Sequence, residues 1–178
     1  SEFWMIEPEI AFADLDMNME VIEAFIKSVG SRIIEKCPEE LAVLERDVDR
    51  LKNVFQPFPR VTHNDAAKIL RGELEVNGKN ALKVQEEDLK NAHEQLAVVQ
   101  AEIAEREEKI KTASKGERKF NEGKIIQLRK DVEILTEKTR NIPGWIESAR
   151  NFSDDEDFGN SDETVLTRVF DAPVMVYN

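Results

Sequence analysis

The chain has 178 residues and a mass of 20.4 kDa, enough for one ordinary domain or a compact core with one appendage. It carries 25 Lys and Arg against 37 Asp and Glu, a formal net charge of −12, so its surface as a whole cannot act as a polyanion-binding face. Charged residues make up 35% of the chain and aromatic residues 7%, a balance typical of long solvated helices. The single cysteine excludes an internal disulfide and a CxxC zinc site, so we expect a cytoplasmic protein, and no apolar run approaches the ~20 residues of a membrane span.

Strand-like apolar runs occupy both ends of the sequence, and we therefore expect the chain to be an internal piece of a longer protein. Residues 3–15 are rich in aromatic and branched side chains, and residues 173–178 alternate at period two, which predicts a strand in each. In an extended first run, Glu7 and Glu9 lie on the same side. Two acids in an apolar run must be solvated, paired or aimed at a cationic ligand group, so both are candidate binding residues.

Helices are predicted between these runs. Apolar residues recur at intervals of three and four from about Asp16 to Cys37, with Asp16 and Asn18 as possible N-caps and Pro38 as the stop. A second helix is predicted over residues 39–55, ended by prolines 57 and 59. A short extended piece at 60–61 then precedes a helix capped by Thr62, and glycines 72 and 78 break the pattern.

A heptad pattern begins at residue 82 and predicts one long helix of about 30 residues. Its seam positions are Leu82, Gln85, Leu89, Ala92, Leu96, Val99, Ile103, Arg106, Ile110 and Ala113. After a break at 114–116, a second heptad helix runs to Pro143, which we expect to end it. Neither helix could bury its apolar stripe alone, so the pair is predicted to form an antiparallel helical hairpin, the arm.

The chain beyond the arm is expected to return to a core. Trp145, Ile146 and Phe152 are the predicted anchors, residues 154–157 form an acidic loop, and residues 162–170 form a helix before the last strand. Neither a GxGxxG nor a GxxxxGK[ST] loop is present, so the common glycine loops for nucleotides are excluded. No catalytic and no metal-binding residue is assigned.

One stretch carries a family resemblance. Residues 2–15, EFWMIEPEIAFADL, resemble the second strand of motif 2 in class II aminoacyl-tRNA synthetases, in the form typical of the asparaginyl type. Residues 57–62 with 66–70 resemble the proline-rich link and following helix of that family. Gly159, Asp162, Glu163, Leu166 and residues 173–177 resemble the helix and strand that lead to its later motifs. The resemblance thus covers residues 2–72 and 158–178.

The resemblance implies an α+β fold: a fragment of the antiparallel-sheet catalytic core of a class II synthetase, made predominantly helical by a long antiparallel coiled-coil hairpin insertion. The implied segments are core at 1–78, hairpin at 79–144 and core again at 145–178. The implied activity condenses asparagine with ATP and transfers the acyl group to tRNA, with Mg and a homodimeric parent enzyme. Phe3 would stack on adenine, Glu7 would face the amino-acid pocket and Glu9 would lie near it.

The same resemblance implies that the chain is inactive alone. The motif 2 arginine would lie before Ser1, and the motif 3 arginine and the magnesium-binding acids would lie after Asn178. Catalysis of this kind stabilises charge on phosphorus, which needs those cations.

The tip of the arm is a candidate tRNA contact. Residues 79–142 carry 14 Lys and Arg against 13 Asp and Glu, so the arm is nearly neutral while the rest is acidic. Between residues 109 and 119 only one acid, Glu117, accompanies the cations Lys109, Lys111, Lys115, Arg118 and Lys119. Such a patch could bind phosphates in a salt-dependent way, and the simpler alternative is a solvated turn.

Two other functions stay open. One is a related enzyme with another substrate, an aspartyl-type synthetase or an ATP-dependent amidating paralogue. The other is a non-catalytic interaction module whose heptads bind a partner helix, which requires an apolar stripe left exposed by the closed hairpin. Because Gln85, Arg106 and Thr139 interrupt a narrow seam, the sequence favours a hairpin that satisfies itself.

Overall fold

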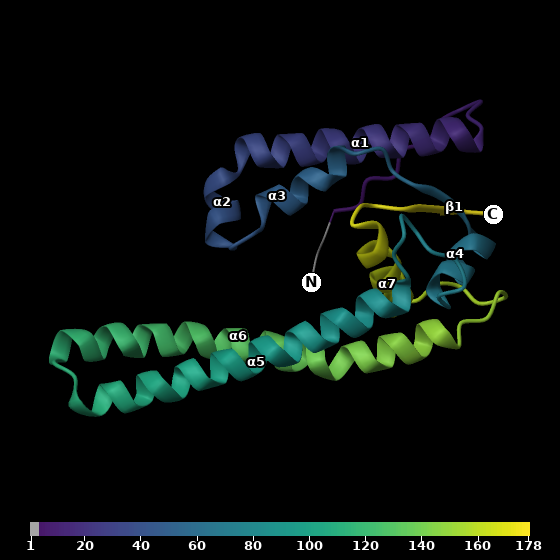
Figure 1. Ribbon diagram of the computed structural model, residues 1–178. Coiled ribbons are helices and arrows are strands. Elements are labelled where there is room, and N and C mark those ends of the chain that lie inside the picture. Colours follow the sequence, from purple (N-terminus) through teal and green to yellow (C-terminus); the bar gives the residue numbers. More distant parts are fainter. Residues whose placement is uncertain (1–3) are drawn as a thin grey trace. The chain divides into compact units, whose positions relative to one another are not determined.

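The computed structural model describes residues 4–178, which divide into two compact units (Figure 1). The first unit comprises the chain up to Val61 together with Phe170–Tyr177, and the second comprises Thr62–Val169. Helices account for about 70% of the chain, as the sequence predicts. Among the helices of residues 4–178, none has both the length and the apolar character needed to cross a bilayer.

Helix α1 (Leu15–Lys36) is the longest element of the first unit and confirms the predicted helix. Asp14 is its N-cap and accepts a hydrogen bond from the Met17 amide at 2.8 Å. This cap lies before both predicted caps, Asp16 and Asn18. Close packing against the 3-10 helix η1 (Lys52–Phe55) requires Gly30, because a Cβ there would lie 2.9 Å from a methyl carbon of Val54.

The single helix predicted over residues 39–55 is wrong. The structure has α2 (Pro38–Val43), α3 (Val48–Leu51) and η1 instead. Glu45 adopts a φ of 51° between α2 and α3, and the Asp47 side chain then caps α3 by accepting from the Arg50 amide at 3.0 Å. A residue in the left-handed region ends a helix, and an aspartate that binds the backbone starts the next one.

A small sheet joins β1 (Arg60–Thr62) to β2 (Met175–Tyr177). The two strands are parallel, and the Met175 amide donates to the Pro59 carbonyl at 2.9 Å. Both short strands were predicted, but the antiparallel catalytic sheet is not confirmed. The strand predicted over residues 3–15 is also wrong within the described part, because residues 4–10 have no regular structure and no described segment pairs with them.

The second unit begins with α4 (His63–Leu70), whose inner face is the most completely buried part of the chain. Thr62 caps it, as predicted, by accepting from the Asp65 amide at 3.2 Å. A tight turn follows, in which Asn77 and Gly78 both have positive φ and Val76 pairs with Lys79. This turn directs the chain from α4 into the arm.

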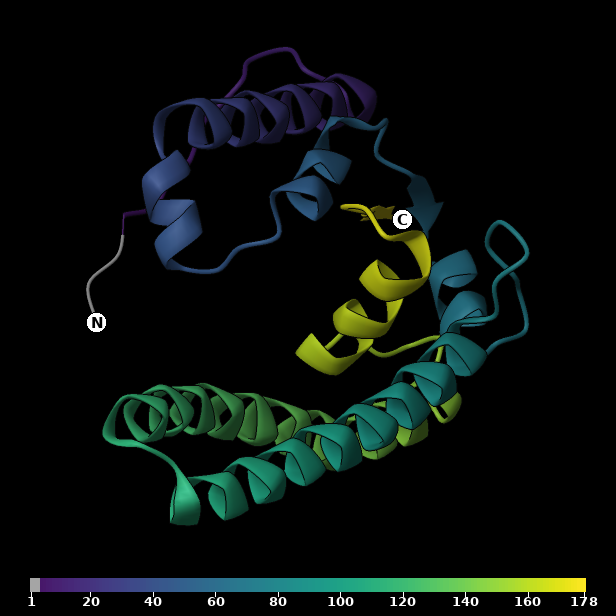
Figure 2. The ribbon, with the colours of Figure 1, turned by 60° about the vertical axis from the view of Figure 1, so that its left-hand side comes forward.

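The arm consists of α5 (Ala81–Thr112) and α6 (Lys115–Arg150), which lie side by side in both views (Figures 1 and 2). Their connection is short because Ser114 and Glu117 form a capping box that starts α6 immediately after α5 ends. The prediction that Pro143 ends the second helix is wrong, since α6 continues through it to Arg150.

Burial along the arm follows the predicted heptads. All ten predicted seam positions, nine in α5 and Ala113 directly after it, are buried or half-buried, and a matching seam runs along α6. The buried or half-buried residues of α6 that follow this spacing are Asn121, Ile125, Leu128, Val132, Leu135, Thr139, Ile142, Ile146 and Ala149. The helical hairpin is therefore present, whereas coiled-coil supercoiling stays a prediction.

Helix α7 (Asn160–Phe170) closes the second unit close to the predicted bounds. Asp162, buried in its first turn, accepts hydrogen bonds from Ser148 Oγ at 3.1 Å and from the Gly159 amide at 3.0 Å. Ile146 and Phe152 are buried, which confirms them as anchors, while Trp145 is half-buried. The division into segments 1–78, 79–144 and 145–178 stays a prediction.

Candidate functional site

The predicted amino-acid-binding residues lie on the extended segment that precedes α1. Glu7 and Glu9 are exposed, and among the described residues neither forms a hydrogen bond or an ion pair. Phe3, the predicted adenine-stacking residue, lies outside the described residues. Trp4 and Phe12 on the same segment are almost fully exposed. The two acids are thus solvated and free to meet a ligand.

A partly exposed apolar stripe runs along α1. Ile22, Phe25, Val29 and Ile33 follow one another at helical spacing, and each is exposed by roughly two fifths of its surface. A contiguous apolar face of this kind is uncommon on the surface of an isolated soluble protein. The first unit therefore has the surface of a part that packs against something else.

Ion pairs along each helix reduce the positive charge of the arm tip. Lys109 binds Glu105 at 2.5 Å, Arg118 binds Glu122 at 3.0 Å, and Lys111 pairs with Glu108. Lys109 also lowers the pKa of Glu105, by a hydrogen bond and by its charge. Within the described part of the chain, Lys115 and Lys119 have no ion-pair partner. Of the five predicted phosphate contacts, these two are the most available.

The acidic loop predicted after the arm is held by one arginine. Arg71 donates to Asp154 Oδ1 at 2.7 Å, to the Phe152 carbonyl at 3.2 Å and to both carboxylate oxygens of Glu73. These carboxylates raise the pKa of Arg71, and hydrogen bonding to Arg71 lowers the pKa of Glu73. The sequence alone offered no sign of this arrangement, because 81 and 83 residues separate Arg71 from its two loop partners.

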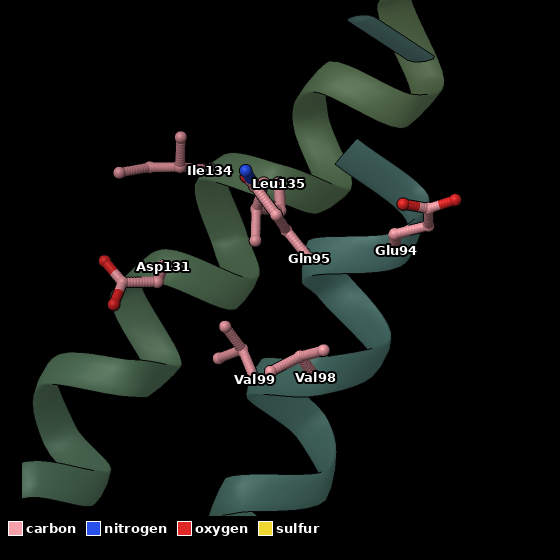
Figure 3. Close-up of a pocket in the computed structure, with 7 residues that line it drawn as sticks. All are labelled: Glu94, Gln95, Val98, Val99, Asp131, Ile134 and Leu135. Atoms are coloured by element: carbon pink, nitrogen blue, oxygen red, sulfur yellow. The ribbon is translucent and has the colours of Figure 1, made fainter. Parts of the chain in front are cut away.

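A groove of about 570 Å³ lies midway along the arm, between α5 and α6 (Figure 3). Val99 and Leu135 lie between the helices, and Glu94 and Asp131 project at the edges. Val98 and Ile134 are 67% and 55% exposed. This is the exposed apolar surface that the interaction-module alternative requires, but it is short and bordered by acids.

A second, more enclosed pocket of about 210 Å³ lies at the root of the arm, where α5, α6 and α7 meet. Its most unusual lining residue is Gln85, which is 1% exposed and whose Nε2 has no hydrogen-bond partner in the described structure. A buried donor without a partner costs about 1–3 kcal/mol. Sequence reasoning identified Gln85 only as an interruption of the seam and missed its neighbours Lys138 and Arg168.

Comparison with known proteins gives the family. Residues 1–173 match the family described as tRNA synthetases class II (D, K and N). Because this match covers nearly the whole chain, the chain belongs to the class II tRNA synthetase family, which confirms the resemblance of residues 2–15.

Several asparagine–tRNA ligases are among the curated relatives of the chain. The asparagine–tRNA ligases of Herpetosiphon aurantiacus, Sorangium cellulosum and Chloroflexus aurantiacus are 46%, 49% and 44% identical over 71, 70 and 78 residues. The matches cover 40%, 39% and 42% of this chain but only 16%, 16% and 18% of those proteins, so the chain spans about a sixth of the length of the curated relatives it matches. No solved structure gives a match.

Proposed function

We propose that the chain is part of the catalytic domain of an asparagine–tRNA ligase, which joins asparagine to ATP with release of pyrophosphate and then transfers the asparaginyl group to tRNA. The identity of 44–49% to three asparagine–tRNA ligases carries this proposal. Class II catalysis by such an enzyme uses ATP and Mg, with tRNA as the second substrate. A cytoplasmic location and a homodimeric enzyme belong to the same proposal.

The segment before α1 is the proposed substrate-binding part. Phe3 would stack on the adenine ring, and Glu7 would accept hydrogen bonds from the ammonium or amide group of asparagine, with Glu9 beside it. The exposure of Glu7 and Glu9 supports this role, because a carboxylate already paired within the chain would have to exchange partners to bind substrate.

The apolar stripe of α1 is proposed to pack on the antiparallel catalytic sheet of the complete enzyme. Full burial of an exposed large apolar side chain contributes about 1.5–3 kcal/mol, and each residue of the stripe from Ile22 to Ile33 still exposes about two fifths of its surface, so the contact would add about that fraction at each of the four positions.

The tip of the arm is proposed to approach tRNA phosphates through Lys115 and Lys119. Both cations are exposed on the first turns of α6 and, in the described structure, neither is paired with an acid. We expect Lys115→Gln with Lys119→Gln to weaken tRNA binding by the complete enzyme and to reduce its salt dependence. Lys109→Gln with Lys111→Gln is the matched control and should have the smaller effect, because those two lysines are already neutralised. Equal losses would remove the proposed contact.

Pyrophosphate–ATP exchange tests the proposed reaction. The complete enzyme should exchange in the presence of asparagine, and the 178-residue chain alone should not. Glu7→Gln in the complete enzyme should weaken asparagine binding about tenfold or more, the effect of one lost charge-assisted hydrogen bond. Exchange with aspartate in place of asparagine would favour the aspartyl-type alternative. Exchange by the chain alone would contradict the assignment of the essential cations to other parts of the enzyme.

A further inference from the structure

The root pocket of the arm has the lining of a ligand site. Three helices of the second unit contribute to it: α5 provides Gln85, Asp88 and Asn91, α6 provides Lys138 and Trp145, and α7 provides Arg168. Its volume of about 210 Å³ accommodates several non-hydrogen atoms, more than a single water requires. It is more enclosed than the open groove of Figure 3 and, unlike that groove, its lining is mostly polar.

Gln85 is the first observation that points to a ligand. The residue is 99% buried, yet its Nε2 has no acceptor in the described part of the chain. Buried polar groups in folded proteins nearly always have a partner, so an orphan amide that lines a pocket indicates an acceptor that belongs to whatever fills the pocket. A seam position that only packs against the other helix normally carries an apolar residue, as at Leu82 and Leu89 on either side of Gln85.

The charge of the pocket is the second observation and is independent of the first. Lys138 and Arg168 bring two positive charges, whereas Asp88 brings one negative charge. Arg168 Nε lies 4.0 Å from Asp88 Oδ2, at the limit of an ion pair, and Lys138 has no acidic partner among the described residues. The pocket is therefore net positive on a chain of net charge −12. Two cations beside neutral amide donors match the hydrogen-bonding needs of an oxyanion.

We propose that the root pocket binds a small oxyanion, a phosphate or a carboxylate. One oxygen of the anion accepts from Gln85 Nε2, and its charge is held between Lys138 and Arg168. Because Arg168 belongs to α7 and the other groups belong to the arm, a bound anion would tie α7 to the root of the arm. The site is separate from the proposed asparagine-binding segment and does not depend on the proposed function.

Fluorescence of Trp145 provides the test on the 178-residue chain. Trp4 is the only other tryptophan, so a Trp4→Phe background leaves Trp145, which lines the pocket, as the single reporter. Titrations with inorganic phosphate and with succinate, at constant ionic strength, should each be tried. We expect a saturable change with at least one of them, and the stronger binder identifies the class of anion.

Variants decide whether the signal comes from this pocket. Lys138→Gln and Arg168→Gln should each weaken binding about tenfold or more, the loss expected for one charge-assisted hydrogen bond. Gln85→Leu should weaken it as well while leaving the helical circular dichroism intact. Lys130→Gln is the matched control, because Lys130 is an exposed lysine on the same helix and does not line the pocket.

Two results would overturn the proposal. The first is the absence of any saturable change with both anions, which would leave water as the occupant that satisfies Gln85. The second is equal weakening by Lys138→Gln and Lys130→Gln, which would reduce the effect to general charge screening. Because Lys138 is exposed, its replacement cannot fail merely by unfolding the core.

Discussion

Adjacent isoleucines on α6 allow a sharp test of how the arm packs. Ile125 is 6% exposed and Ile126 is 63% exposed, so the same substitution to alanine is made one residue apart in opposite environments. Replacing a buried isoleucine by alanine removes apolar contacts and leaves a cavity, which costs about 2–5 kcal/mol. Because a two-helix hairpin lets solvent reach the edges of such a cavity, we expect Ile125→Ala to cost about 2–3 kcal/mol.

Ile126→Ala should behave differently. Little apolar surface is lost, and alanine has the higher helix propensity, so the expected change lies within about 0.5 kcal/mol of zero. Urea unfolding followed by far-UV circular dichroism measures both values, with an unchanged m-value as the check that the unfolding transition is the same.

A second pair of adjacent residues on α6 repeats the comparison at an independent site. In Ile134 and Leu135 the order is reversed, since Ile134 is 55% exposed and Leu135 is 8% exposed. Leu135→Ala should therefore be the costly change and Ile134→Ala the mild one. Equal costs within both pairs, or larger costs at Ile126 and Ile134, would show that the seam faces another side of α6 and would refute the packing described.

Three further changes test local features of the second unit. Gly72→Ala should lower the free energy of unfolding more than Gly78→Ala. Both glycines have φ near +75°, which strains alanine by about 1 kcal/mol. Only at Gly72 would the new Cβ also lie 3.0 Å from the amide side chain of Asn80, which caps α5. Urea midpoints of the two variants give the comparison. Arg71→Gln should destabilise the chain at neutral pH and have a smaller effect in acid. The depressed pKa of Glu73 stabilises the fold above the ordinary carboxyl pKa, and this contribution disappears as pH falls through the folded-state value, whereas the bond to the Phe152 carbonyl does not titrate. A difference between wild type and variant that stays constant from about pH 7 to about pH 3 would contradict it. Ser114→Ala should cost about 1 kcal/mol by removing the hydroxyl that donates to Glu117 Oε2 at 2.6 Å, measured by thermal unfolding, and no loss would mean that this hydrogen bond is dispensable.

Helix starts could be predicted from the sequence, while breaks that depend on one backbone angle could not. The acid three residues after Thr62 predicts that Thr62 caps the helix, and in the structure Thr62 does so. By contrast, the residues from 39 to 55 have continuous apolar spacing, and the positive φ of Glu45 ends the helix within it. Non-glycine residues rarely adopt this conformation, so the residue type at position 45 does not indicate the break. Asp47, a favoured N-cap residue that starts α3, is a signal in the sequence that the prediction of one helix overlooks.

Pro143 shows how packing outweighs a local rule. A proline inside a helix removes one backbone hydrogen bond and costs about 3 kcal/mol, which is why the sequence predicted an end there. Yet Ile142, Ile146 and Ala149, on either side of the proline, are all buried. Ending the helix at Pro143 would expose these side chains, and their combined burial exceeds the cost of the proline.

The charge at the arm tip was overestimated because a sequence window counts neighbours along the chain. On a helix, the neighbours of a side chain stand three and four residues away. Glu105, Glu108 and Glu122 all lie outside the window of residues 109–119. Each of them nevertheless pairs with a cation that lies within this window. Only Lys115 and Lys119 keep the availability that the count suggested.

The polar interruptions of the seam looked alike in the sequence but differ chemically in the structure. Arg106 binds Glu102 at 2.7 Å and donates across the arm to Asn121 Oδ1 at 3.0 Å, so its charge is balanced and it links the two helices. Thr139 donates to the carbonyl of residue 136, within its own helix. Gln85 has neither kind of partner for its Nε2. At Arg106 and Thr139, a polar residue in the seam is therefore compatible with a self-contained hairpin. At Gln85 the buried amide requires an acceptor from outside the protein. For this reason we place the ligand in the root pocket and not at the tip of the arm or in the groove.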